Sequence, residues 1–505
     1  MSKLSHRLQA VLPQRLAGMR RGVEKESLRT DAAGHLSLSP HPLALGSALT
    51  HPSITTDFSE SQLELITGAH TSVEATAAEL LQIHQFVVRH IGSDRLWVNS
   101  MPCGLPADDE IPIGRYGSSN VGLAKSIYRT GLGHRYGRRM QTISGIHYNW
   151  SMPGLTNDEY LGLIRNLRRH SFLLLYLFGA SPAVCESFVA GRPHELVPLG
   201  AHTLGMPHAT SLRMGRLGYQ SDAQSGIAVS YNDLEGYCAS LERALTLPYA
   251  PYEALGVRDA DGHYLQLGTS LLQIENEFYG TVRPKRSIRP GERPLHALRE
   301  RGIEYVEVRC MDLDPFEPLG IAAPTMRMLD IFLLHCLLAE SPPDSPQETA
   351  AMARNQHRTA SHGREPGLRL ERDGGEVTLT AWGSELVEAC QPLAAALDEV
   401  HGGHEHAQAL ELAALRLIDS GATPSARVLA TAASDHGSSF VAFARASAER
   451  THSALQQMPL SAELQAHFEQ LARQSIADQA AREAADDLPF EAYRQAYLSP
   501  LQLRP

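Results

Sequence analysis

The chain has 505 residues, 43% of them hydrophobic and 20% charged, which is a globular composition long enough to bury a large core. Its formal net charge of −11 argues against a nucleic-acid partner, because phosphate binding needs a basic surface. The longest apolar run, residues 172–180, is too short to span a bilayer, so we expect no membrane association. The first 18 residues predict an amphipathic helix and not a secretory signal.

The six cysteines are widely separated in the sequence, and no two of them form a CxxC pair. This pattern argues against a zinc ribbon and against a disulfide framework. We therefore predict reduced thiols and a cytoplasmic protein.

The stretch 22–29 reads GVEKESLR and predicts a strand. Alternation along a strand places Glu24 and Glu26 on one face, with Val23 and Lys25 on the other. Two carboxylates at that distance repel each other unless a cation lies between them. A solvated edge strand is the alternative, and the octapeptide alone favours it.

Two further strand-like segments present polar groups on one face. In 62–67, Glu64 points away from the neighbouring leucines, which is also what a solvated carboxylate would do. In 141–150, His147 and Asn149 share a face opposite apolar and aromatic residues. A histidine beside an amide can ligate a metal, although a lone histidine is more often structural.

Two clusters of basic residues stand out in this acidic chain. The first lies in the segment after residue 120, where a phosphate-binding role and a solvated helix face are equally compatible with the pattern. The second is the run 283–286, which could cradle a phosphate or could simply be a charged loop. The basic residues of the first cluster are Lys125, Arg129, Arg135, Arg138 and Arg139.

Residues 270–279 alternate as a strand would. The alternation places Glu275, Glu277 and Tyr279 on one face, as a second pair of carboxylates at positions i and i+2. Residues 270–279 are therefore predicted to face the same site as residues 22–29.

Residues 303–312 predict another strand, rich in β-branched residues. Glu307 and Arg309 share one of its faces, about 7 Å apart, where they could hold a cation and a phosphate side by side. A simple ion pair between neighbours explains the segment equally well.

From residue 325 onward the chain is mostly helical in pattern. Residues 328–338 predict an apolar helix, and 341–367 predict a poorly ordered connection rich in Pro, Ser and Gln. Residues 384–487 predict Ala-rich helices broken near Gly402 and Gly421. We expect this third of the chain to act as a scaffold or lid.

The strand-like segments together predict a sheet with carboxylates, a histidine and an arginine on one face. Such a face suits hard divalent cations bound through oxygen, which in turn hold the phosphates of a nucleotide.

Several ordered motifs resemble the proteobacterial glutamate–cysteine ligase family, and the resemblance spans residues 22 to about 316. The motifs are GVEKESLR (22–29), LGSALTH (45–51), ITTDFSE (54–60), MQTISGIHYN (140–149), LFGASP (177–182), RPKR (283–286) and GIEYVEVR (302–309).

This resemblance implies an α+β fold of the glutamine-synthetase type, a curved antiparallel sheet flanked by helices. It implies one catalytic unit over 1–505, with a sheet-centred active-site part at 22–316 and a helical part at 325–505. The implied activity is the ATP-dependent joining of the glutamate γ-carboxylate to the cysteine amine through a γ-glutamyl phosphate, the first step of glutathione synthesis. ATP is then a co-substrate and Mg²⁺ the cofactor, with Mn²⁺ as a substitute, and the protein is expected to be a monomer.

The resemblance also assigns roles to residues by their position in the motifs. Glu307 and Arg309 are implied to be catalytic, with Arg309 on the transferred phosphate. The implied metal ligands are Glu24, Glu26, Asp57, Glu64, His147 and Glu307. The residues implied to recognise cysteine rest on shorter matches and are Tyr128, Arg213, Tyr219 and Tyr279.

Two alternatives stay open from the sequence. One is a related carboxylate–amine ligase that uses another amine acceptor. The other is a non-catalytic protein that kept the fold and binds a metal or nucleotide, although simple metal storage would not require Arg309.

Overall fold

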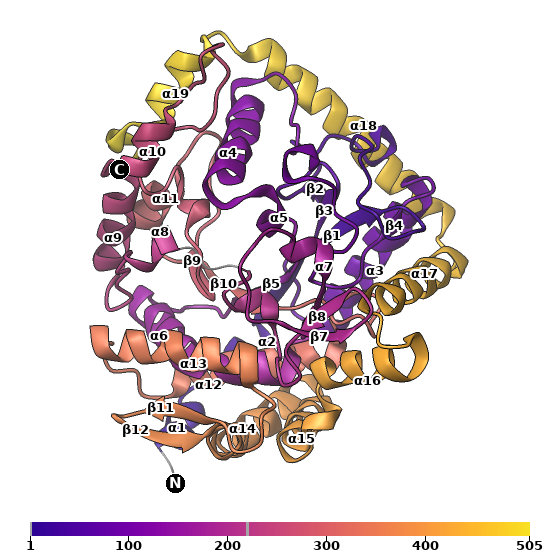
Figure 1. Ribbon diagram of the computed structural model, residues 1–505. Helices are drawn as coiled ribbons and strands as arrows, with labels where there is room; N and C mark the ends of the chain where they lie inside the picture. The colour runs from indigo at the N-terminus through magenta and orange to yellow at the C-terminus, as the bar shows by residue number, and fades with distance from the viewer. Residues whose placement is uncertain (1–2, 219–221) are drawn as a thin grey trace.

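A computed structural model of the chain describes residues 3–218 and 222–505 (Figure 1). Its centre is an antiparallel sheet with the strand order β2-β3-β1-β5-β10-β9, to which β4 adds by pairing with β1. The strands of this sheet are β1 (Arg20–Thr30), β2 (Ile54–Thr56), β3 (Gln62–Ile66), β4 (Arg95–Leu96), β5 (Ile146–Ser151), β9 (Val282–Lys285) and β10 (Tyr305–Met311).

Two small antiparallel sheets lie outside the central one. Their strands are β6 (Ala183–Cys185), β7 (Val197–Gly200) and β8 (Thr203–Gly205) in one sheet, and β11 (Arg369–Arg372) and β12 (Gly375–Thr378) in the other.

Helices surround the central sheet. In the first half of the chain they are α1 (Lys3–Gln9), α2 (Pro13–Ala17), α3 (Val73–His90), α4 (Asn120–Tyr136), α5 (Arg138–Gln141), α6 (Asn157–Phe178), α7 (Glu186–Val189), α8 (Asp222–Ser225), α9 (Leu234–Thr246) and α10 (Ala250–Leu255). In the second half they are α11 (Pro294–Arg301), α12 (Ala323–Leu338), α13 (Pro346–His362), α14 (Leu379–His401), α15 (Glu405–Ile418), α16 (Pro424–His436), α17 (Phe440–Gln457), α18 (Ala462–Ala485) and α19 (Phe490–Leu498). None of them, within the described residues, is long and apolar enough to cross a membrane.

The central strand β1 has its two faces in different surroundings. Val23 and the apolar residues of β5 and β10 belong to the larger hydrophobic core, together with side chains of α3, α6 and α12. Lys25 points to this same side, where its Nζ lies 2.8 Å from Nε2 of His84 on α3. The opposite face carries Glu24 and Glu26, as alternation along the strand predicts.

The helices are distributed unevenly around the sheet (Figure 1). Helices α6, α12 and α13 run side by side along its lower edge in this view, and α14 and α15 lie beneath them. Helix α6 contacts β9 and β10 directly, and α12 contacts α6 and α3. The last two helices, α18 and α19, pass over the opposite side of the molecule and contact the η1 turn (Leu43–Leu45) and α4.

Several predictions about local structure are wrong. The expected N-terminal helix is two short helices, α1 and α2, because Pro13 starts a new helix. The expected disordered connection at 341–367 contains helix α13. The side chain of Ser345 caps its N-terminus, and the helix packs along α6. Of the two alternatives for 283–286, the charged loop is wrong, since most of the run forms the edge strand β9.

The segment 270–279 is not a strand. It turns through a short 3₁₀ helix at Glu275–Glu277, so alternation does not apply there. Glu275 accepts hydrogen bonds from Arg293 at 2.6 and 3.0 Å, and Glu277 accepts them from Arg135 at 2.9 Å and Tyr136 at 2.8 Å. These carboxylates therefore neutralise buried arginines and hold loops together.

The prediction of reduced thiols is also wrong at one pair. Cys103 and Cys185 form a disulfide with a Cα–Cα distance of 5.4 Å, although 82 residues separate them in sequence. The bond ties the loop after β4 to β6. The other four cysteines, Cys238, Cys310, Cys336 and Cys390, are buried free thiols.

Candidate active site

The polar face of the central sheet opens into a cavity of about 450 Å³. This volume suits a small-molecule substrate or cofactor. Every residue predicted to bind a metal lines this cavity. These residues are Glu24, Glu26, Asp57, Glu64, His147 and Glu307.

Strand register brings most of these side chains together. On β1, Glu26 pairs across from Glu64 of β3, and Glu24 pairs across from His147 of β5. On the next strand, Glu307 pairs across from Asn149. A one-residue slip of any strand would turn its carboxylate to the apolar side, so the hydrophobic core fixes the site.

Glu24, Glu64 and His147 form a group of donors that could share one ion. One ligand atom from each lies within 4.8 Å of the other two. Nε2 of His147 is buried without a hydrogen-bond partner among the described residues, and it lies 3.6 Å from a carboxylate oxygen of Glu26. An unsatisfied nitrogen among carboxylates is a costly arrangement that a divalent cation would satisfy, so the residues fit Mg²⁺ or Mn²⁺.

Burial and the repulsion between neighbouring carboxylates raise the pKa values of two of these carboxyl groups. Burial raises the pKa of Glu26 to about 8, and the charge of Asp57 adds to this shift. Burial also raises the pKa of Glu64 well above its ordinary value, with the charges of Glu24 and Asp57 adding to the effect. A bound cation would favour the ionised forms.

Two other carboxyl groups stay ionised because they have partners. Burial acts against ionisation of Glu24, but a hydrogen bond to Nδ1 of His147 at 3.2 Å helps to hold its pKa below the ordinary value. Asn149 donates a second hydrogen bond to Glu24 at 2.8 Å. Burial opposes ionisation of Glu307 too, yet the charges of Lys285 and Arg309 hold its pKa well below normal.

Positive charge lines the β9–β10 side of the same cavity. Nη1 of Arg309 lies 3.0 Å from Glu307, and Nζ of Lys285 lies 3.1 Å from the other oxygen of that carboxylate. Arg283 also lines the cavity and is 4.0 Å from Glu307. The cavity therefore has a donor set for a cation at β1, β3 and β5 and a cationic wall for an anion at β9 and β10.

The residues predicted to recognise cysteine have different positions. Tyr128 of α4 and Tyr279 line the cavity, and the phenol of Tyr279 accepts a hydrogen bond from Gln141 at 2.8 Å. Arg213 is buried and is not among the lining residues. Tyr219 lies outside the described residues.

Arg213 has a supporting position beneath the site. Its Nη2 donates to the carbonyl oxygen of Arg309 at 2.9 Å, and Nη1 lies 3.8 Å from the buried Asp312. Its guanidinium passes directly over Gly145, where any Cβ would collide with it. Gly145 in turn donates its N–H to Glu26 at 2.7 Å, so Arg213 contacts the backbone that orients Glu26 and Arg309.

No sequence motif predicted that the last helix, α19, lines the cavity. Tyr493 and Tyr497 of α19 line the cavity although they are nearly 190 residues beyond Arg309. Arg293 donates to the carbonyl of Tyr497 at 2.8 Å and lies over its ring, 4.7 Å from the centroid. Nearby, Glu483 accepts a hydrogen bond from the N–H of Ser118 at 2.8 Å, just before α4.

Lys125 and Arg129 of α4 also line the cavity, as a phosphate-binding role of the basic cluster after residue 120 would require. Both lie over the ring of Tyr116, at 5.0 and 4.5 Å from its centroid. Burial lowers the pKa of Lys125 to about 8. The other arginines of that cluster point elsewhere: Arg135 donates to Glu277, Arg138 to the carbonyl of Ile111 and Arg139 to the carbonyl of Ser187.

An antiparallel sheet with carboxylates and a histidine on one side of a cavity and arginine and lysine on the other is typical of one class of enzymes. These are the ATP-dependent ligases with a glutamine-synthetase-like fold, which must bring an anionic substrate to an anionic nucleotide.

Comparison with known proteins identifies the family within this class. Residues 6–359 match the family model described as glutamate-cysteine ligase. A glutamate–cysteine ligase of Azotobacter vinelandii is 48% identical over 95% of this chain and 94% of its own, and that of Alcanivorax borkumensis is 47% identical over 98% and 99%. The crystal structure of the Francisella tularensis glutamate–cysteine ligase in complex with AMP superposes with a TM-score of 0.91, at 34% identity over 95% and 97% of the two chains.

The chain belongs to the glutamate–cysteine ligase family. It is an enzyme of the ligase class, and the ATP-dependent reaction of this family is the first step of glutathione synthesis. The predicted family and the predicted α+β fold with a helical C-terminal region are thus confirmed.

Proposed function

We propose that the cavity on the polar face of the sheet joins the γ-carboxylate of L-glutamate to the amine of L-cysteine through a γ-glutamyl phosphate. The observation that carries the proposal is the arrangement of opposite charges. Glu24, Glu64 and His147 gather within 4.8 Å on one side, and Arg309 and Lys285 lie on the other. This arrangement can neutralise ATP and a carboxylate in one place.

Divalent cations complete the site in this proposal. Glu24, Glu64 and His147 would hold one ion, and Glu26, Asp57 and Glu307 are the further carboxylates available around the cavity. Bound Mg²⁺ would neutralise phosphate charge that would otherwise repel the glutamate carboxylate.

Arg309 is the group that we place on the transferred phosphate. Glu307 orients its guanidinium through the 3.0 Å contact, and Arg213 fixes its backbone. An oxygen of the γ-carboxylate forms a bond to the γ-phosphorus while the bond to the ADP oxygen breaks. The cysteine nitrogen then bonds to the acyl carbon, and inorganic phosphate leaves.

Cysteine recognition is assigned to the end of the cavity near Tyr128 and Tyr279. Phenol rings can enclose a small thiol side chain, and both tyrosines line the cavity. Arg213 and Tyr219 complete the proposed set. Because Arg213 is buried against the backbone of Arg309, a direct role would require its guanidinium to turn toward the cavity.

A four-component assay tests the reaction. Phosphate release should require ATP, Mg²⁺, glutamate and cysteine together, and it should stop when a chelator removes the metal. Competition with 2-aminobutyrate and with bulky or charged amino acids should show preference for a small acceptor. Phosphate release that is independent of cysteine would contradict the proposal, and preference for a different amine would favour a related ligase.

We also propose that the enzyme works as a monomer in the cytoplasm. A single copy brings all the predicted metal ligands into one cavity, which is what a monomeric enzyme requires. Light scattering at micromolar concentration would measure the mass, and cell fractionation would locate the protein. Alkylation of thiols before lysis would show whether the Cys103–Cys185 bond forms in that compartment, where disulfides are uncommon.

A further inference from the structure

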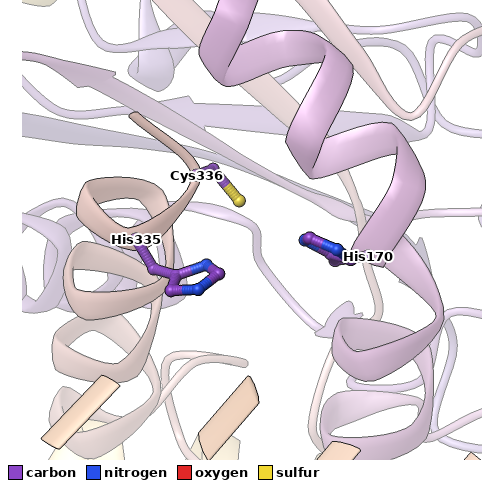
Figure 2. Close-up of side chains that lie close together, drawn as sticks. All are labelled: His170, His335 and Cys336. Carbon is purple, nitrogen blue, oxygen red and sulfur yellow. The ribbon is translucent and has the colours of Figure 1, made fainter. Parts of the chain in front are cut away.

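A second group of metal-binding side chains lies between α6 and α12. His170 is on α6, and His335 and Cys336 are successive residues on α12. One ligand atom from each of the three lies within 4.8 Å of the other two. Figure 2 shows both imidazole rings and the thiol pointing into the same space between the two helices.

The two histidines lack the partners that buried imidazoles usually have. Nδ1 of His170 and Nδ1 of His335 are both buried with no hydrogen-bond partner among the described residues. His335 is only 6% exposed and Cys336 is 0% exposed. Buried polar atoms are almost always satisfied in folded proteins, so two unpaired nitrogens beside a thiol are candidates for ligating an ion.

The surroundings hold His170 in place and leave a way in. Its ring packs edge-on against Trp382 of α14, with 5.9 Å between centroids, and lies 5.9 Å from the ring of His335. His170 and Trp382 also line an open cavity of about 1010 Å³, bordered by Asn166 and Arg169 of α6. An ion can therefore reach His170 from solvent, while His335 and Cys336 form the buried end of the cluster.

We propose that His170, His335 and Cys336 form a binding site for a thiophilic divalent transition-metal ion of the Zn²⁺ type. Two imidazoles and one thiolate match the nitrogen and sulfur ligands that Zn²⁺ takes, with the fourth position facing the open cavity. Mg²⁺ would not compete, because it prefers oxygen ligands.

The required geometry is within reach of small side-chain movements. Bond lengths of about 2.0 Å to nitrogen and about 2.3 Å to sulfur put tetrahedral ligand atoms about 3.3 to 3.6 Å apart. The donor atoms already lie within 4.8 Å of one another. Because successive residues on a helix diverge by about 100°, the ion would sit in the angle between His335 and Cys336, with His170 closing the third side.

This site is separate from the ATP and glutamate cavity. Helices α6 and α12 contribute to the hydrophobic core on the other face of the sheet, and α6 contacts β9 and β10 from that side. No cysteine is among the described residues that line the catalytic cavity. A sulfur-specific signal therefore does not come from the catalytic cavity, even when that cavity is also loaded with metal, and the variants below assign it to one thiol.

Cobalt substitution tests the proposal on the full chain. Co²⁺ added to the metal-free protein should produce a thiolate-to-cobalt charge-transfer band in the near ultraviolet and strong visible bands of a tetrahedral ion. Excess Mg²⁺ should leave both, and Zn²⁺ should remove both by displacing Co²⁺. Competition with a chromophoric chelator then gives the Zn²⁺ affinity.

Three variants locate the ligands. Cys336→Ser should abolish the charge-transfer band and weaken Zn²⁺ binding by more than about 100-fold, since loss of an outer-shell partner alone costs about 10- to 100-fold. His170→Asn should weaken binding similarly, and it is the safer variant for folding because His170 borders the open cavity. Cys238→Ser removes another buried thiol, on α9, and should keep the band.

Two results would overturn the proposal. One is the absence of a thiolate band in the wild-type protein at stoichiometric Co²⁺. The other is a band that persists in Cys336→Ser, or that is unchanged in His170→Asn when thermal unfolding shows that the variant is folded. Failure of the four-component phosphate assay would leave the metal site standing, because the spectroscopic readout does not depend on turnover.

Discussion

Two pairs of glutamates in this chain share the same i and i+2 spacing but do different work. Glu24 and Glu26 lie on β1 and face the catalytic cavity. Glu275 and Glu277 lie in a 3₁₀ turn, where each one faces a buried arginine. The comparison shows that spacing does not decide the role of a carboxylate pair. A pair in which each carboxylate has its own arginine is structural, whereas the crowded pair on β1 suits the external cation that we propose.

The largest expected effect is on the rate of phosphate release by the catalytic cavity. Arg309→Ala should lower phosphate release by about 10³-fold or more, as loss of an arginine from a transferred phosphate does elsewhere. Glu307→Gln should act in the same direction by releasing Arg309 and Lys285. Steady-state phosphate release measures both. Arg286→Ala, just after β9 at a half-buried position that pairs with Glu304, is the control and should stay near wild type. Full activity in Arg309→Ala would refute the assignment.

The second effect falls on the structural pair. Glu277→Gln should lower the free energy of unfolding by about 3 to 5 kcal/mol, because it leaves Arg135 buried without a counter-charge. Denaturant unfolding measures the loss. Glu300→Gln removes a surface partner of Arg289 and should cost less than about 1 kcal/mol. If the Glu277→Gln protein has unchanged stability but needs more Mg²⁺ for activity, then Glu277 serves the metal and not the structure.

A smaller effect distinguishes metal binding from cysteine binding. Glu24→Gln should raise the Mg²⁺ concentration needed for half-maximal activity by about 100-fold, comparable to other losses around a metal centre. The KM for cysteine should change little, since Tyr128 and Tyr279 are untouched. Titrating Mg²⁺ at saturating substrates, and cysteine at saturating Mg²⁺, ATP and glutamate, measures the two effects separately. A matching rise in both values would mean that the β1 carboxylates also serve the acceptor.

The smallest expected effect is on how the free energy of unfolding depends on pH, through His51 just before β2. Nδ1 of His51 accepts hydrogen bonds from the N–H groups of Ser53 and Ile54 at 3.1 and 2.9 Å, and burial lowers its pKa to about 4. The unfolded chain therefore binds more protons below pH 6.5, and stability falls as the pH drops from about 6.5 toward 4. The contribution lost between pH 7 and pH 5 is about 2 kcal/mol.

His51→Asn checks this origin, because an asparagine oxygen can accept the same hydrogen bonds without titrating. The variant should lose less stability than the wild type between pH 7 and pH 5 in denaturant unfolding. Parallel pH curves for the two proteins would show that other groups cause the acid sensitivity.

The alternation of side chains along a strand correctly predicted which residues of the regular strands face the cavity. Glu24, Glu26, Glu64, His147 and Glu307 all face the cavity as their strand positions require. The same rule failed at 270–279, since alternating polarity does not distinguish a strand from a turn whose carboxylates meet arginines distant in sequence.

Other features depend on contacts that no local pattern contains. Cys103 and Cys185 meet across 82 residues, and only the folded chain brings them together. Helix α13 forms from a segment of low apolar content because α6 covers one of its faces. Tyr493 and Tyr497 reach the cavity by way of α18 and α19, a path that cannot be read from their own sequence.

The position of these two tyrosines has a consequence for how the enzyme is made. Strands β1 to β10 leave the ribosome well before α19 does, so the sheet and its carboxylates can assemble while the rest of the chain is still being synthesised. The cavity gains its Tyr493 and Tyr497 wall only after residue 497 has emerged, and Arg293 must wait until then for the carbonyl that it contacts. A ribosome stalled before this point would hold a chain with a folded core and an unfinished active site.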